Sequence, residues 1–365
     1  MKVLIVNPIL YTNENRNIKK VNTIKDTMIY DLCLAFLKKD CDVTLAASDL
    51  YKPISDEAYP FNVVWMKTKC TKLCPPHSLP YCPETKKIAK AGNFDLIITS
   101  EVFSLNSLSL AIHSPKNLIV WQELGKHNRI MHGYASKFWY GIIAKLFFKK
   151  ALVVARSEQA KNFISKYCKN VSDTIIDHGV NSEKFKPCTE KENQFAISSQ
   201  LIARKQIDKS ITAFANYVKK YDESAKLYIM GDGEERSNLE TLVKKLNIQS
   251  NIIFTGKLSH NELIEILKKS KAMLVYTQSD LNMVSIVESI SLATPVITTS
   301  VPYCSTYIKG KKLGIVNDSW NENDLFELSQ NSKEYVENCL NYSKTTTTKY
   351  KAEQFLKEKG IKFNE

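Results

Sequence analysis

The stretch YTQSDLNMVSIVESISLATPV, residues 276–296, predicts a buried strand, a polar loop and an apolar helix in direct succession. Two acids stand eight residues apart in it: Asp280 lies in the loop and Glu288 on the helix. If the helix begins near Met283, its first backbone amides have no acceptor within the helix and form a positive end that suits a phosphate. The two acids and the amides could together hold a sugar nucleotide at three points. An ordinary strand–loop–helix unit with solvated acids is the alternative.

The alternation of short apolar runs and longer helical patterns extends along the whole chain and predicts an α/β protein with parallel sheets. In the first half we expect strands over Lys2–Asn7, Asp42–Ala46, Asn62–Trp65, Leu96–Thr99, Asn117–Trp121, Leu152–Ala155 and Asp177–Val180. In the second half we expect strands over Phe195–Ser199, Lys226–Met230, Ile252–Thr255, Ala272–Tyr276 and Val296–Thr299. Besides the helix that carries Glu288, we expect helices over Thr23–Lys39, Ala135–Lys150, Lys161–Tyr167, Lys209–Lys220, Glu235–Leu246, Asn261–Lys268 and Lys349–Lys359.

The polar segment Asn181–Asn193, which contains Pro187, is the best candidate for a linker between the two halves. We therefore predict two Rossmann-like domains, residues 1–183 and 184–345, facing each other across a cleft. In open α/β sheets, ligands bind outside the carboxyl ends of the strands, so loops of both domains would line that cleft. Residues 346–365 form a C-terminal segment that contains the helix expected over Lys349–Lys359.

The composition of the chain limits the classes of molecule that it is expected to bind. The chain has 365 residues, with 44% hydrophobic and 24% charged residues, as in ordinary globular domains. Its net charge of +13 favours anionic partners such as nucleotide phosphates or acidic lipid surfaces. The lysines are spread along the chain and no zinc-finger or RRM signature occurs, so nucleic acid is not an expected partner.

The chain is expected to work in the cytoplasm, either free or peripherally on the inner face of the cytoplasmic membrane. MKVLIVNPIL does not resemble a signal peptide, and no apolar run approaches the roughly 20 residues that span a bilayer. The nine cysteines then indicate reduced thiols. One group, Cys70, Cys74, His77 and Cys82, could form a zinc site, but its irregular spacing favours a chance cluster. No metal and no cofactor is expected.

Two further motifs point to a phosphate. SSQLIARKQIDKSI, residues 198–211, follows a predicted strand and carries Gln200, Arg204 and Lys205 in a loop before a helix, where cations suit a diphosphate. A basic surface turn is the alternative. IMGDGEE, residues 229–235, places Gly231 where the backbone can approach a ligand closely, although a structural turn would use it equally.

Residues 185–320 resemble the nucleotide-sugar-binding half of the family-4 glycosyltransferases, which are retaining enzymes with the GT-B fold of two facing Rossmann domains. Five landmarks occur in the family's order: HGVNSEKFKP, SSQLIARKQIDKSI, IMGDGEE, IIFTGKLSHNEL and DLNMVSIVE. The last contains the paired acids with the family's seven intervening residues. The resemblance implies that a sugar passes from a nucleotide donor to a glycan or lipid-linked acceptor in surface polysaccharide synthesis.

The resemblance also implies that residues 1–183 bind the acceptor, that residues 184–345 bind the nucleotide sugar, and that residues 346–365 return to the first domain as a helix that lets the cleft close.

It further implies a role for individual residues. Arg204 and Lys205 would hold the donor diphosphate and replace a metal ion in balancing the leaving group. Glu288 would bind the ribose and Asp280 the transferred sugar. Further donor contacts are implied for Gln200, Gly231, Gly256, Lys257, Leu258, Asn282, Met283 and Val284.

The chain departs from the family pattern at several places. Asp280 replaces a glutamate, Gln200 replaces an arginine, and the loop after the first strand, residues 7–20, has no glycine. These departures leave open a catalytically silent sugar-nucleotide-binding subunit. A GT-B nucleotide-sugar epimerase is a further alternative, and a nucleic-acid-binding protein is suggested by charge alone.

On the acceptor side, Gln122 stands where the family often has a histidine, and we expect the neighbouring Glu123 and His127 to act there. Ser100–Glu101 and Arg156–Ser157, also at predicted strand ends, are the next candidates. In SKFWYGIIAKLFFKK, residues 136–150, aromatic residues alternate with lysines. As a helix it could lie on an anionic bilayer surface, or it could pack in the domain with its lysines solvated.

Overall fold

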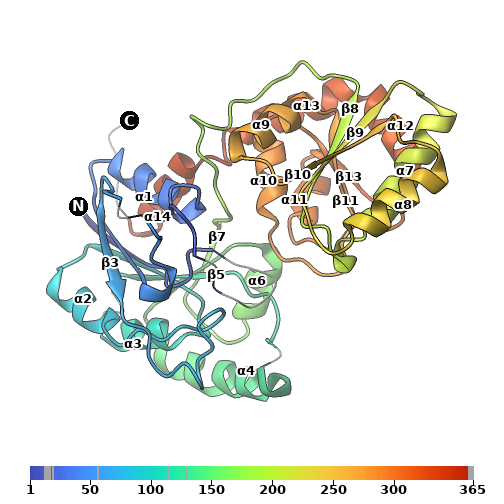
Figure 1. The fold of residues 1–365 in the computed structure, drawn as a ribbon. Helices are drawn as coiled ribbons and strands as arrows, with labels where there is room; N and C mark the ends of the chain where they lie inside the picture. Colours follow the sequence, from blue (N-terminus) through green and yellow to red (C-terminus); the bar gives the residue numbers. More distant parts are fainter. Residues whose placement is uncertain (12–17, 19, 56, 114–115, 129, 361–365) are drawn as a thin grey trace. The chain divides into compact units, whose positions relative to one another are not determined.

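The computed structural model describes residues 1–11, 18, 20–55, 57–113, 116–128 and 130–360. It divides the chain into two compact units, one of Met1–Gly179 with Thr348–Glu365 and one of Val180–Thr347 (Figure 1). The predicted loop of residues 7–20 lies partly outside the described residues. Each unit is a parallel sheet with helices on both faces, which is the Rossmann-like arrangement predicted.

The first unit has a seven-stranded sheet in the order β3-β2-β1-β4-β5-β6-β7, with all paired strands parallel. The chain moves outward from β1 in one direction and from β4 in the other, so the loops that follow these two strands diverge. The strands are β1 (Lys2–Val6), β2 (Asp42–Ser48), β3 (Asn62–Met66), β4 (Leu96–Ser100), β5 (Leu118–Gln122), β6 (Leu152–Ala155) and β7 (Val171–Ile175).

Helices cover both faces of this sheet because its central strands are apolar on both sides. One face packs against α1 (Met28–Leu37) and α14 (Thr348–Glu358), which bring Phe36 and Phe355 within 6.4 Å of each other between ring centroids. The other face packs against α2 (Thr85–Ala91), α3 (Leu105–His113), α6 (Glu158–Ile164) and the helical segment of α4 (Tyr134–Phe138), η3 (Trp139–Ala144) and α5 (Lys145–Phe147). Short 3-10 turns stand at η1 (Asp49–Tyr51) and η2 (Ile130–Gly133).

The second unit has a six-stranded sheet in the order β10-β9-β8-β11-β12-β13, again parallel and again diverging at its centre, between β8 and β11. The strands are β8 (Gln194–Ser198), β9 (Lys226–Met230), β10 (Ile252–Gly256), β11 (Ala272–Val275), β12 (Val296–Thr298) and β13 (Gly314–Val316). One face packs against α7 (Ile207–Lys220), α8 (Arg236–Leu246) and α12 (Glu322–Gln330), and the other against α9 (His260–Lys269), α10 (Val284–Ser291), α11 (Ser305–Gly310) and α13 (Ser332–Ser343).

Some sequence predictions were wrong. The strand expected over Asp177–Val180 is absent there, since only Val180 forms an isolated bridge, with Thr347; the last strand of the first sheet is β7. The sequence of β7, VSDTI, is half polar and lies at the edge of the sheet, so it lacks the apolar run by which the other strands were predicted. Helices α2, α3, α11, α12 and α13 and strand β13 were not predicted. The helix expected over Ala135–Lys150 begins at Tyr134, ends at Phe147 and contains a π-helical turn, η3.

Candidate active site

The diverging loops of the second unit carry three of the predicted donor residues. The loop after β8 forms a 3-10 turn, η4 (Ala203–Lys205), with Arg204 and Lys205, and the loop after β11 carries Asp280. A backbone hydrogen bond from the amide of Gln278 to the carbonyl oxygen of Arg204, 2.9 Å long, joins the two loops. The side chains that the sequence separates by about 75 positions therefore meet at the carboxyl ends of the two central strands.

Asp280 accepts hydrogen bonds from both cations. Arg204 Nη1 lies 3.0 Å from Asp280 Oδ1, and Lys205 Nζ lies 3.0 and 2.8 Å from Oδ1 and Oδ2. The hydroxyl of Thr277 also donates to Oδ2, and the side chains of Lys205 and Asp280 are only 11% and 13% exposed. Burial alone would raise the pKa of the Asp280 carboxyl, but the hydrogen bonds from Lys205, Thr277 and Arg204 and the charge of Lys205 lower it below its ordinary value.

Gly231 fixes the position of the loop after β8. A Cβ at Gly231 would lie 1.8 Å from the carbonyl oxygen of Ser199, and its φ of +142° disfavours other residues. The next residue, Asp232, is hydrogen-bonded to the same loop, since the amide of Leu201 donates to the carbonyl of Asp232 at 3.1 Å. The structure thus uses this glycine for close backbone packing beneath the loop that carries the two cations.

Helix α10 begins where the sequence predicted. Met283 is its N-cap in an extended conformation with no side-chain capping bond, and the first intrahelical bond of the helix comes from Ile286 N to Met283 O at 3.1 Å. The amide of Val284 lies in the first turn, where helices lack internal acceptors. Met283 and Lys205 line one small hollow together with Ser199 and Tyr276, so the helix start and the cation lie side by side.

Glu288, on the second turn of α10, is held by a residue that the sequence did not single out. His260 Nε2 lies 2.9 Å from Glu288 Oε1, and the ring of Phe185 packs edge-on against His260 with centroids 5.2 Å apart. His260 is the first residue of α9, whose N-cap Ser259 forms a capping box with Glu262. The segment IIFTGKLSHNEL contained His260, but only the fold shows that its ring reaches Glu288.

The other predicted donor residues lie around this centre with fewer contacts. Gln200 and Lys257 are exposed, and Leu258 packs partly against the core between the sheet and α9. Gly256 ends β10 with a φ of +70°, and Asn282 directly precedes the N-cap of α10.

In the first unit, three of the predicted acceptor-side candidates converge at the carboxyl ends of β4, β5 and β6. Glu123 Oε2 lies 3.1 Å from Arg156 Nη1, and Glu123 Oε1 lies 3.7 Å from His178 Nε2. The Arg156 guanidinium stacks on the ring of Trp121 at 3.7 Å. The carboxylate of Glu101 accepts a 2.7 Å hydrogen bond from the backbone amide of Glu123. His178, quoted in the HGVNSEKFKP motif, had no predicted role.

The two carboxyl groups of this cluster differ in charge state. Burial raises the pKa of Glu101 to about 7, although the hydrogen bond from the Glu123 amide acts against it. Burial also acts to raise the pKa of Glu123, but the charge of Arg156 and the hydrogen bond and charge of His178 outweigh it and hold that pKa well below its ordinary value. At neutral pH, one carboxyl is therefore ionised and the other is near its midpoint. Enzymes use such pairs for proton transfer.

His127 contacts a different set of side chains. Its Nδ1 is 3.0 Å from Ser136 Oγ and its Nε2 is 3.1 Å from the Tyr167 hydroxyl, so both ring nitrogens are engaged. Its ring packs edge-on against Phe163, and burial, followed by the charge of Lys137, lowers its pKa. These contacts hold the His127 ring in place within the first unit.

The remaining candidates are also engaged in local structure. Gln122 is fully buried, with its side-chain oxygen accepting from Val102 N at 2.9 Å. Ser100 donates to Asn7 at 2.8 Å across the centre of the sheet, and Ser157 is the N-cap of α6. Arg129, two residues after His127, lies outside the described residues.

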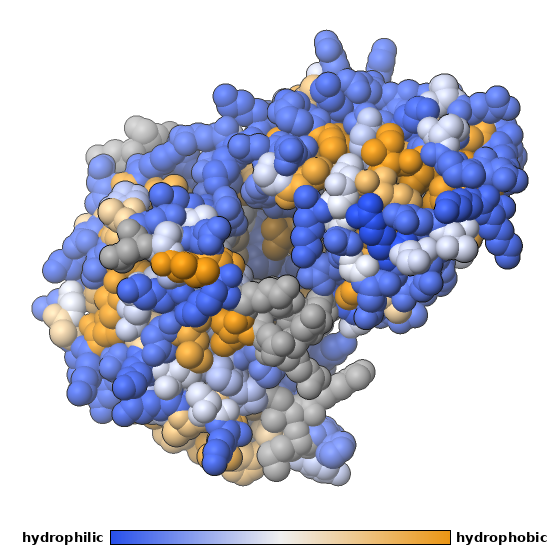
Figure 2. Space-filling model, viewed as in Figure 1, coloured by the Kyte–Doolittle hydropathy of each residue, from blue (hydrophilic) through white to orange (hydrophobic). Residues whose placement is uncertain are grey.

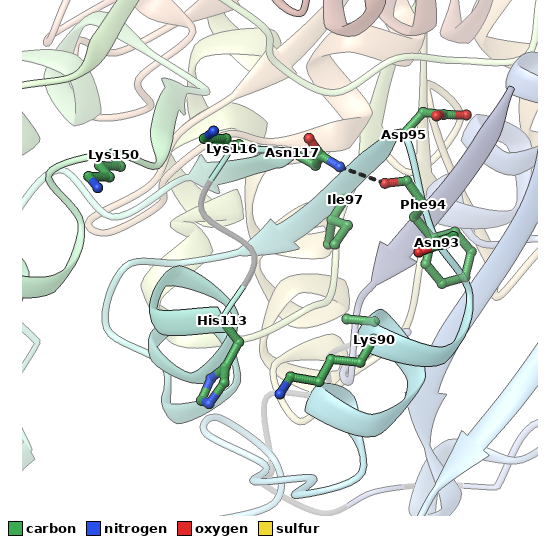
Figure 3. A pocket seen from close by; sticks show the side chains of 10 residues that line it. Lys90, Asn93, Phe94, Asp95, Ile97, His113, Lys116, Asn117 and Lys150 are labelled. Atoms are coloured by element: carbon green, nitrogen blue, oxygen red, sulfur yellow. Dashed lines mark hydrogen bonds between the residues drawn. The ribbon is translucent and has the colours of Figure 1, made fainter.

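A groove of about 740 Å³ lies at the other end of the strands of the first sheet, at the amino ends of β4 and β5 (Figure 3). Its lining includes Lys90, Asp95, His113, Asn117 and Lys150. Asn117 donates to the carbonyl of Phe94 at 2.8 Å, which joins the two strand starts. The lysines are exposed and the groove is separate from the Glu101–Glu123 cluster.

Within the described residues, no group of three or more His, Cys, Asp or Glu side chains is arranged to hold a metal ion, and this includes Cys70, Cys74, His77 and Cys82. All nine cysteines are free thiols. No helix in the described part of the chain has the length and apolar character to cross a membrane.

Comparison with known proteins identifies the second unit. The family described as Glycosyl transferases group 1 matches residues 181–345. Residues 181–345 are a group 1 glycosyltransferase domain. This confirms the resemblance that the five motifs indicated.

Individual relatives agree with this family. The chain is 26% identical over 265 residues to the alpha-monoglucosyldiacylglycerol synthase of Streptococcus pneumoniae, which covers 66% of this chain and 59% of that protein. The chain therefore spans less than two thirds of the length of the curated relatives it matches. Among solved structures, sucrose-phosphate synthase from Thermosynechococcus elongatus superposes with a TM-score of 0.67 at 15% identity over 98% of both chains. Alr3699/HepE of Anabaena, solved in complex with UDP, gives a TM-score of 0.67 at 14% identity over 98% of this chain and 99% of the other. The GT-B fold prediction is thereby confirmed for the whole chain.

Proposed function

We propose that this chain is a retaining hexosyltransferase, which moves a sugar from a nucleotide-sugar donor to a glycan or lipid-linked glycan in surface polysaccharide synthesis. The observation that carries the proposal is the meeting of Arg204, Lys205 and the start of α10 at the diverging strands of the group 1 domain. Two cations beside the first amides of a helix, which have no acceptor within the helix, suit a diphosphate. The S. pneumoniae relative, named as a glycolipid synthase, and the UDP complex of HepE support this class of donor and acceptor.

The proposed reaction breaks the bond between the sugar C1 and the diphosphate oxygen and forms a bond from C1 to the acceptor oxygen on the same face. The proton of the acceptor hydroxyl passes to the departing diphosphate. Arg204, Lys205 and the amides of α10 offset the charge that develops on that group, so we expect no metal ion and no cofactor to be required. Glu288, oriented by His260, accepts hydrogen bonds from the ribose hydroxyls.

On the acceptor side, we assign the ionised Glu123 to binding hydroxyl groups of the acceptor. Arg156 and His178 contact its carboxylate, and the guanidinium of Arg156 stacks on the ring of Trp121. An ionised carboxylate that is 26% exposed can accept hydrogen bonds from a sugar without large desolvation. Glu101 contributes through the backbone amide of Glu123 that it holds.

Contact with an anionic membrane is part of the proposal, and with it a cytoplasmic, peripheral location. Residues four apart on the α4–α5 segment expose a continuous apolar stripe: Tyr134 (72% exposed), Phe138 (59%), Ile142 (46%) and Leu146 (55%). Figure 2 shows apolar side chains at the lower edge of the view, where α4 lies in Figure 1. Exposed lysines flank the stripe at 137, 145, 149 and 150. This combination suits the surface of an anionic bilayer.

A sedimentation assay tests the membrane contact. The wild type should bind vesicles of phosphatidylglycerol at low salt and not those of phosphatidylcholine alone. Phe138→Asp should abolish binding, whereas Ile54→Asp, which changes another exposed apolar residue of the same unit, should not. Equal behaviour of the two variants would reject this part of the proposal.

The donor is tested by thermal shift and transfer assays with UDP-, GDP-, ADP- and CMP-sugars. We expect one nucleotide class to stabilise the wild type but not Glu288→Ala. Glu265→Ala, which removes an exposed carboxylate on α9, is the matched control and should respond as the wild type does. No response to any class would contradict the proposal. Donor binding without transfer or hydrolysis would favour a silent subunit, and donor conversion without acceptor would favour an epimerase.

A further inference from the structure

We propose that Asp280 is a positioning residue that competes with the diphosphate for Arg204 and Lys205, and that it thereby promotes release of the nucleoside diphosphate product. This deepens the proposed function and rests on it. It differs from the role that the resemblance implied, in which the first acid contacts the transferred sugar.

The contacts of Asp280 carry the inference. Its two carboxylate oxygens accept from Arg204 Nη1, from Lys205 Nζ and from the Thr277 hydroxyl. The carboxylate is therefore already occupied by the two cations assigned to the donor diphosphate. A group held in this way is poorly placed to bind a sugar hydroxyl, because its acceptor positions face the cations.

Lys205 makes the competition strong. Its side chain is 11% exposed, and Nζ lies within 3.0 Å of both Asp280 oxygens. A largely buried ammonium group needs a counter-charge. In the unliganded protein that counter-charge is Asp280, and when the donor is bound it can be the diphosphate. The two anions thus alternate as partners of one cation.

The size of the effect follows from Coulomb's law. A phosphate group bound to Lys205 would lie roughly 6 Å from the centre of the Asp280 carboxylate, and at an effective dielectric constant of about 20 their repulsion corresponds to roughly a hundredfold in binding constant. Without the carboxylate, the side chains of Arg204 and Lys205 are less ordered before the diphosphate binds. Ordering them on binding weakens the affinity by about tenfold. The net expectation for Asp280→Asn is about tenfold tighter binding of a nucleoside diphosphate.

Such a competitor has a use in a transfer cycle. Once the sugar has left and the proton taken from the acceptor has passed on to solvent, the diphosphate carries more negative charge than the donor did and binds the cations more strongly. A carboxylate poised to take the same cations accelerates its departure. Product release limits the rate of many enzymes, so this contact would raise turnover at the expense of ground-state affinity.

The experiment uses the whole chain and compares wild type, Asp280→Asn and Asp280→Glu. Affinities for UDP, GDP and ADP, and for the matching glucose conjugates, are measured by calorimetry, and dissociation rates by stopped flow. We expect Asp280→Asn to bind the preferred nucleoside diphosphate about tenfold more tightly, with a slower dissociation rate and stronger product inhibition. Asp280→Glu retains the charge and should stay close to the wild type. Thermal unfolding verifies that each variant is folded.

The outcomes separate the hypotheses. Weaker binding of the glucose conjugate by Asp280→Asn, with unchanged binding of the nucleoside diphosphate, would mean that Asp280 contacts the sugar and would overturn the inference. Weaker binding of both would mean that it only orders the cations, which also overturns it. If wild type and variants bind no nucleotide at all, the proposed function itself fails.

Discussion

The two carboxyl groups at the ends of β4 and β5 predict opposite effects of pH on stability. Burial holds the pKa of Glu101 at about 7, against an ordinary value of 4.5, whereas Arg156 and His178 hold the pKa of Glu123 well below that value. The informative perturbation is Glu101→Gln, which removes the ionisable group and keeps an oxygen that can accept from the Glu123 amide.

The sign follows from proton binding. Between pH 4.5 and 7 the native state keeps the Glu101 proton that the unfolded chain releases, so the free energy of unfolding of the wild type falls as the pH rises through this window. Each pKa unit corresponds to about 1.4 kcal/mol, so the loss approaches about 3 kcal/mol by pH 8. Glu101→Gln lacks this loss. It should be more stable than the wild type at pH 8 by up to about 3 kcal/mol and equal to it near pH 4.5.

Glu123→Gln is the control with the opposite sign. The depressed pKa of Glu123 stabilises the fold above the ordinary value and loses this effect as the pH falls through the folded value. This variant should therefore be less stable than the wild type at pH 7 and approach it in acid. Because two units need not unfold together, thermal unfolding from pH 4.5 to 8 should be paired with hydrogen exchange of the β4 and β5 amides.

Parallel stability curves for wild type and Glu101→Gln across this range would refute the reasoning. They would mean that the Glu101 carboxyl is ionised in the folded protein without penalty. Both carboxyl groups of the cluster would then be ionised at neutral pH, and the difference in charge state between Glu101 and Glu123 would not exist.

Two further predictions concern the second unit. Gly231→Ala should lower the free energy of unfolding by about 2 kcal/mol or more, because its Cβ would meet the Ser199 carbonyl. Gly310→Ala, whose Cβ would lie in open space, should leave the free energy of unfolding unchanged. Thermal unfolding measures both variants. His260→Ala should raise the donor KM about tenfold with little change in kcat, the cost of losing a hydrogen bond to a charged group, and His260→Gln should retain most of the affinity. A fall in kcat with unchanged KM would instead place His260 at the reacting atoms.

The buried strands of both sheets could be predicted from the sequence because each is a short apolar run between turns. The run LIITS in β4 and the run AMLV in β11 have no other plausible place than a parallel core. Strand β7 and helix α12 could not be recognised in this way. VSDTI lies at an edge and α12 carries Glu322 and Asp324 in its first turn, so polar residues hide their patterns.

The site was predictable only where its residues lie close in sequence. Arg204 and Lys205 stand together in one loop, and Asp280 and Glu288 share one motif, so a pattern could find them. His260 reaches Glu288 from 28 positions away, and His178 reaches Glu123 from beyond β7. Such pairs depend on the strand order, which periodicity does not give. The same limit explains why His127, a loop histidine beside Glu123 in sequence, packs against Tyr167 in the fold.

The two proposed anionic ligands, the nucleotide and the membrane, are distinguished by where the positive charges of the protein lie and not by its net charge. The chain carries a net +13, yet at the donor site the Asp280 carboxylate is paired with both Arg204 and Lys205. Because Lys205 and Asp280 are largely buried, salt screens them little. The exposed lysines beside the apolar stripe of α4–α5 are screened strongly. Raising the salt from about 0.05 to 0.5 M should therefore release the protein from anionic vesicles while its affinity for the nucleotide changes only a few-fold. Equal salt dependence of the two would mean that the donor, like the membrane, is held by surface charge.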